Sequence, residues 1–121
     1  VYDLARFPNV CMKFHGLGEF AARAMPVTEP FPFVRPLPPL LDMAFERFGP
    51  DRMMWGSDYP HPEGSWPKTR PHLQKTFSGL PDADIAAMLG ENAIAFYGFD
   101  RAALAPVAAR IGPARTDFNT H

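Results

Sequence analysis

The sequence predicts an α/β fold built on parallel strands, and three observations support this prediction. Two short runs, residues 10–15 and 53–57, alternate between apolar and other side chains, as strands do. An amphipathic helical stretch lies between them, which is the order of a βαβ unit. Further helical stretches follow the second run. Two parallel strands rarely form a sheet by themselves, so the sequence indicates part of a larger sheet.

The first predicted strand, residues 10–15, lies between a Pro-Asn turn signal and a glycine. Its alternate residues divide into two faces. One face carries Cys11, Lys13 and His15, and the other is wholly apolar, with Val10, Met12 and Phe14. We expect the apolar face to pack against helices and the polar face to point toward a site.

The segment between the strands divides into a loop and a helix. Six prolines in residues 26–39 prevent a regular helix there and leave room for one turn near residues 19–24. Residues 40–48 place apolar side chains on one helical stripe, and Gly49-Pro50 provides the stop. We expect a loop followed by a short helix.

The second predicted strand, residues 53–57, ends at an aspartate. Alternation puts Met54, Gly56 and Asp58 on one face and turns Trp55 toward the core on the other. Helices are predicted over residues 69–77, 82–89, 91–97 and 101–111. Asp82 and Asp100 are the expected N-caps of the helices over residues 82–89 and 101–111. Gly98 and Gly112 are the expected exits of the helices over residues 91–97 and 101–111.

Composition and charge exclude several classes of partner. Twelve basic and thirteen acidic residues give a formal net charge of -1, without a run of like charge that would attract nucleic acid or a lipid surface. The lone Cys11 cannot form an internal disulfide, and no apolar stretch is long enough to span a membrane. We expect a cytoplasmic protein. The start at Val1, without a signal peptide, suggests a piece of a longer chain.

Four stretches together resemble a known family. They are PNVCMKFHGLGEF, FGPDRMMWGSDYPHPEG, MLGENAIAFYGFD and LAPVAARIGP, and they are similar to the C-terminal third of the amidohydrolase-related (amidohydrolase 2) proteins. The resemblance implies a TIM-like (β/α)₈ barrel, of which residues 1–121 would be the C-terminal segment. The two predicted strands would then be strands 7 and 8, with their flanking helices.

The resemblance gives Asp58 a catalytic role. In a barrel of this kind, active sites lie at the carboxyl ends of the strands, where Asp58 follows the second one. Its family counterpart binds a divalent metal, for which zinc is expected, and handles the proton of an attacking water, or acts as a base without metal in some lactonases. The family's histidine ligands would lie upstream of Val1. The structural alternative for Asp58 is that of a turn or helix-capping aspartate.

Three further residues are candidates for substrate binding. His15 and Lys13 share the polar face of the first strand, and His61 follows Asp58 by three residues in a proline-rich loop. Each has a structural alternative: a hydrogen-bonding histidine, a lysine whose stem packs in the barrel, and a solvent-exposed loop histidine. Family members often carry serine at the position of His15, so the resemblance does not define its role. Asp51 and Arg52 are interpreted as a structural pair at the bottom of the second strand.

The resulting hypothesis is a hydrolase that acts on a small lactone or carboxylated ring-derived substrate. Two alternatives remain open: a metal-dependent, non-oxidative decarboxylase of the same family, and a truncated, catalytically inactive remnant. We expect the isolated 121-residue fragment to be inactive even if the complete barrel is an enzyme. A small molecule is the expected partner, and a homo-oligomer is left open.

Overall fold

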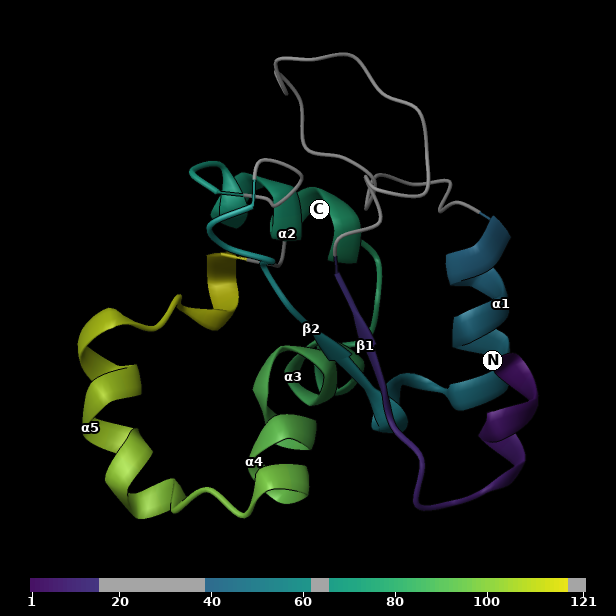
Figure 1. Cartoon of the computed structure of the whole chain (residues 1–121). Coiled ribbons are helices and arrows are strands. Elements are labelled where there is room, and N and C mark those ends of the chain that lie inside the picture. The colour runs from purple at the N-terminus through teal and green to yellow at the C-terminus, as the bar shows by residue number, and fades with distance from the viewer. Residues whose placement is uncertain (16–38, 62–65, 118–121) are drawn as a thin grey trace.

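Two parallel strands cross the centre of the molecule (Figure 1). The computed structural model describes residues 1–15, 39–61 and 66–117. Strand β1, Met12–Phe14, pairs with β2, Met53–Trp55, in the register Met12 to Met53 and Phe14 to Trp55. Both strands are shorter than predicted, because ladder pairing is confined to three residues of each. One more bond, from Gly56 N to Phe14 O at 3.3 Å, continues beyond β2.

The helix predicted between the strands is present, which confirms the βαβ order. Helix α1, Pro39–Phe48, is followed by the 3₁₀ turn η3, Pro50–Arg52. Gly49 ends the helix as predicted: its φ of 74° is unfavourable for other residues, and its N–H donates to Phe45 O. The turn predicted near residues 19–24 lies outside the described residues.

The remaining elements follow β2. Helix α2, Thr69–Phe77, and helix α5, Arg101–Ile111, have the predicted bounds. The 3₁₀ turns η1, Tyr2–Arg6, and η5, Arg115–Asp117, lie near the two ends of the described chain. The prediction of Asp100 as N-cap is confirmed, because its Oδ1 accepts a hydrogen bond from Ala102 N at 2.8 Å.

Two predicted helices join into one helical run. Helix α3, Asp82–Ala86, continues through a π-helical turn, η4, Ala87–Glu91, into α4, Asn92–Tyr97. The predicted break between residues 89 and 91 is therefore wrong: the extra residue of the π turn carries the chain through Gly90. Asp82 is also not the N-cap, since Pro81 occupies that position and Asp82 opens the helix. Gly98 ends α4 in the left-handed conformation, as predicted.

The core lies between the strands and the helices on one side of them. Among the described residues, eight buried side chains form it: Phe14, Ala44, Phe48, Met53, Leu73, Phe77, Ile85 and Met88. The ring of Phe14 packs against that of Phe77 with centroids 6.3 Å apart. Val10, Met12 and Trp55 contact the same cluster, which confirms the predicted apolar faces of both strands. On the opposite face Met54 is buried as well, whereas its register partner Lys13 is exposed.

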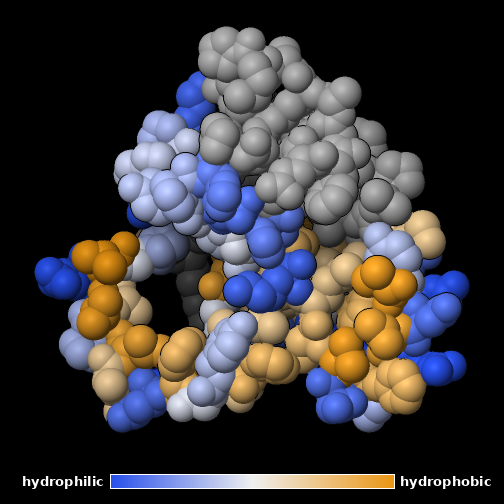
Figure 2. Space-filling view, in the orientation of Figure 1, coloured by the Kyte–Doolittle hydropathy of each residue, from blue (hydrophilic) through white to orange (hydrophobic). Residues whose placement is uncertain are grey.

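Helix α5 stands apart from this core. Every residue of α5 is exposed, including Leu104, Val107 and Ile111, and Figure 2 shows apolar surface at this edge of the molecule. Within the described residues, none of the helices has the length and apolar character needed to cross a membrane.

Candidate active site at the carboxyl ends of the strands

Asp58 lies just beyond the carboxyl end of β2. Its backbone has a φ of 57°, in the left-handed region that non-glycine residues seldom occupy and that aspartate tolerates better than most. This conformation ends the extended chain and turns it into the following loop. The side chain is 17% exposed, so the carboxylate is shielded but can still be reached by water.

His15 occupies the matching place beyond β1. Its Nδ1 lies 3.2 Å from Asp58 Oδ1, although 43 residues separate the two in the chain. The contact arises because parallel strands in register end at the same edge of a sheet. The imidazole is 45% exposed, so the pair lies at the surface of the described part of the molecule.

Gly56 makes this approach possible. A Cβ at this position would lie 3.3 Å from His15 Cβ and 3.7 Å from both Cγ and Cδ2 of the ring. A side chain here would therefore be tight against His15 Cβ and in ordinary van der Waals contact with the ring. Sequence reasoning placed Gly56 on the face of Asp58 without giving it a role, although a glycine inside a strand is a known signal of close approach by another group.

The loop after Asp58 begins with a tight turn. The carbonyl of Asp58 accepts a hydrogen bond from His61 N at 2.8 Å, and Ser57 Oγ accepts one from Tyr59 N at 3.3 Å. The turn therefore holds the backbone of His61 close to Asp58, while the His61 side chain is exposed.

The remaining candidate, Lys13, is two residues before His15 on the same strand face. It is exposed, and its register partner is Met54. In the described ranges, no hydrogen bond or ion pair joins the side chain of Lys13 or His61 to another residue. The structure thus joins two of the four predicted site residues directly, His15 and Asp58.

The opposite ends of the strands hold polar residues of another kind. Arg52 donates to the main-chain carbonyls of Ala5, Phe7, Arg47 and Phe48 at 2.9–3.2 Å. The predicted structural role of Arg52 is thus supported. Among the described residues its hydrogen-bond acceptors are these four carbonyl oxygens and do not include the carboxylate of Asp51.

Asn92 makes a similar contact that the sequence did not reveal. Its Nδ2 donates to Pro50 O and Met53 O, both at 2.7 Å. These bonds attach the start of α4 to the start of β2. The segment GENA therefore contributes a structural amide, and the only sequence signal for it was the motif itself.

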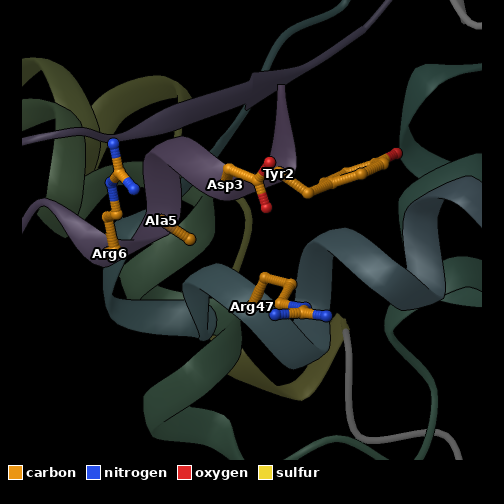
Figure 3. A pocket seen from close by; sticks show the side chains of 5 residues that line it. All are labelled: Tyr2, Asp3, Ala5, Arg6 and Arg47. Atoms are coloured by element: carbon orange, nitrogen blue, oxygen red, sulfur yellow. The ribbon is translucent and has the colours of Figure 1, made fainter.

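A shallow pocket lies at this same end of the molecule (Figure 3). It is lined by Tyr2, Asp3, Ala5, Arg6 and Arg47, from η1 and the last turn of α1. Since Arg47 precedes the start of β2 and Asp58 follows its end, this pocket does not belong to the site of Asp58.

The side chains of Asp58 and His15 provide part of the ligand set that a metal ion requires. Asp58 and His15 place one carboxylate and one imidazole side by side, and both groups are ordinary zinc ligands. No cluster of three or more His, Cys, Asp or Glu side chains occurs among the described residues. Asp58 fits a metal as a single ligand, and a complete coordination sphere requires donors from elsewhere.

These features define an α/β protein with a carboxylate and an imidazole at the edge where parallel-stranded enzymes carry their reacting groups. The model of the amidohydrolase family matches residues 1–99. The chain belongs to the amidohydrolase family, specifically the amidohydrolase 2 group, as the sequence motifs indicated. No curated protein and no solved structure matches the chain.

Proposed function

We propose that the full-length protein is a hydrolase that opens small lactones, with Asp58 as the residue that accepts the proton of the attacking water. One observation carries the proposal: the Asp58 carboxylate lies at the carboxyl end of β2, shielded and beside His15. Membership of an enzymatic family supports it.

The proposal includes a place in the fold. We assign β1 and β2 to the seventh and eighth strands of a (β/α)₈ barrel, in which the carboxyl ends of all strands surround one active site. Their parallel pairing and the helix between them agree with consecutive barrel strands. Residues that complete the site would then come from the other strands.

The chemical steps follow from the carboxylate. A water oxygen attacks the lactone carbonyl carbon while one water proton passes to Asp58. The ring C–O bond then breaks, the departing alkoxide takes that proton, and the product is a hydroxy acid. A free aspartate, with a pKa near 4, is a weak base at neutral pH. A divalent metal, for which zinc is expected, would be held in part by Asp58 and would polarise the carbonyl and acidify the water.

Lys13 and His61 are assigned to substrate binding. The ammonium of Lys13 lies on the strand face of His15 and suits a substrate carboxylate, and the exposed His61 is held near Asp58 by the turn. These roles account for a carboxylated, ring-derived substrate.

The test is Asp58→Asn in the full-length protein, assayed with dihydrocoumarin as a lactone probe. Activity is expected to fall about 10²- to 10⁴-fold, since amide oxygen is a far weaker base. The unfolding free energy is expected to change by less than about 1 kcal/mol, because asparagine tolerates the left-handed backbone and still accepts from His15.

Asp51→Asn is the matched control, because it makes the same change seven residues earlier, at the other end of β2. It should leave the rate unchanged. Full activity of Asp58→Asn would exclude the proposal. Release of carbon dioxide from a hydroxybenzoate, without lactone hydrolysis, would favour the decarboxylase of the same family instead.

A further inference from the structure

The contact between His15 and Asp58 has a defined direction. A carboxylate oxygen only accepts hydrogen bonds, so the imidazole must donate to it. The atom within reach is Nδ1, at 3.2 Å from Oδ1. A neutral His15 in this contact therefore carries its proton on Nδ1.

The backbone beneath the ring holds this geometry. His15 lies close to the backbone of Gly56. A Cβ built on Gly56 would be only 3.3 Å from His15 Cβ. Gly56 is itself fixed by the bond from its N–H to Phe14 O, the carbonyl that immediately precedes His15. Gly56, which lies beside the imidazole, and Phe14, which precedes His15, are therefore joined by one main-chain hydrogen bond.

We propose that His15 is a positioning residue for Asp58: its Nδ1–H fixes Oδ1 and leaves Oδ2 to receive the proton of water. This inference rests on the proposed role of Asp58 as base. Among the described residues, the contact with His15 Nδ1 is the side-chain hydrogen bond that orients the Asp58 carboxylate. Outer-shell partners that orient the ligands of a metal site typically contribute about 10- to 100-fold to activity or metal affinity, and we expect an effect of the same order here.

A positioning role for His15 and direct substrate binding by His15 predict different kinetic effects. A substrate contact made equally in the ground and transition states would change KM, whereas misorientation of the base lowers kcat. It also gives Gly56 a function: its missing Cβ leaves room for the Cβ from which the His15 ring extends.

The first experiment compares His15→Ala, His15→Asn and Gly56→Ala with the native full-length protein, using dihydrocoumarin hydrolysis. His15→Ala should lower kcat about 10- to 100-fold with little change in KM. His15→Asn should recover much of this loss, since its amide nitrogen can donate from near the position of Nδ1. Gly56→Ala should also lower kcat, although both members of the pair remain.

The second experiment needs no substrate. NMR of protein labelled with ¹⁵N-histidine distinguishes the two neutral tautomers, and His15 is expected to carry its proton on Nδ1. Asp58→Gly, which accepts the left-handed backbone, should remove that preference. This measurement decides the question even if a His15 variant fails to fold.

The outcomes separate this inference from the proposed function. Unchanged kcat in His15→Ala, together with an inactive Asp58→Asn, would overturn the positioning role and leave Asp58 as the base. A rise in KM alone would make His15 a substrate contact and also overturn it. A proton on Nε2 in the native protein would exclude the Nδ1–H donor. An active Asp58→Asn would instead reject the function on which the inference depends.

Discussion

The two ends of β2 hold polar side chains in opposite ways. At its start, Arg52 and Asn92 are bound by main-chain carbonyls. Beyond its end, Asp58 is bound by another side chain, His15, and both are open to water to some degree. A polar group saturated by backbone has little capacity left for a ligand. A carboxylate with one oxygen that bonds to no other described residue retains this capacity.

At the start of β2, the side chain of Arg52 connects segments that are distant in the sequence. Two of the carbonyls bound by Arg52, those of Arg47 and Phe48, belong to the last turn of α1, where helical carbonyls lack partners within the helix. The other two belong to Ala5 and Phe7, at η1. One guanidinium thus joins the N-terminal segment to the helix that precedes β2.

The largest expected effect on stability comes from Arg52→Ala. It leaves four carbonyls without their charged donor, and we expect the unfolding free energy of the full-length protein to fall by about 2–4 kcal/mol in urea titration. Arg52→Lys should recover less than half, since an ammonium lacks the planar fork. Arg47→Ala is the matched control, because it removes a neighbouring guanidinium but keeps the carbonyl. A loss of the proposed lactonase activity per folded molecule would contradict the division of roles between the two ends of β2.

A smaller effect is expected at Asn92. Replacement by alanine leaves the carbonyls of Pro50 and Met53 unpaired and should cost about 1–3 kcal/mol. Asn92→Asp should cost more at neutral pH, because it places a carboxylate against two carbonyl oxygens. Asn9 is exposed, so Asn9→Asp is the control for the effect of one added negative charge. Equal stability of the aspartate and alanine variants would show that Asn92 does not act as a donor.

The smallest effect is expected at the exposed ion pair between Glu91 and Arg101. Arg101 donates to Glu91 Oε1 at 2.9 Å and also to Oε2. The hydrogen bond to Glu91, and then the charge of Glu91, raise the pKa of Arg101 above its ordinary value. A raised pKa stabilises the fold at every pH below it, so no pH dependence is expected in the working range. Arg101→Ala should leave the melting temperature unchanged within error, at low and high salt alike.

Local patterns were sufficient to predict most of the fold. The alternation in residues 10–15 correctly assigned Phe14 to the core and His15 to the other face, because strand geometry has a strict period of two. Gly49-Pro50 correctly marked the end of α1. The passage through Gly90 was missed, since a π turn has no local signature that distinguishes it from a helix break.

The contacts across the chain could not be predicted in the same way. Alternation and position suggested that His15 and Asp58 share a side, but their hydrogen bond depends on strand register, which local sequence does not specify. Arg52 was paired with its neighbour Asp51 because proximity in sequence was the only guide. Its actual acceptors on Ala5 and Phe7 lie 47 and 45 residues away.

The close approach of His15 to Gly56 also limits how this protein can evolve. A Cβ at position 56 would lie 3.3 Å from the Cβ of His15, an atom that every residue except glycine carries, and only in ordinary van der Waals contact with two ring atoms at 3.7 Å. The constraint on position 56 therefore comes mainly from the spacing of the two backbones. It is expected to persist in relatives that carry another residue in place of His15.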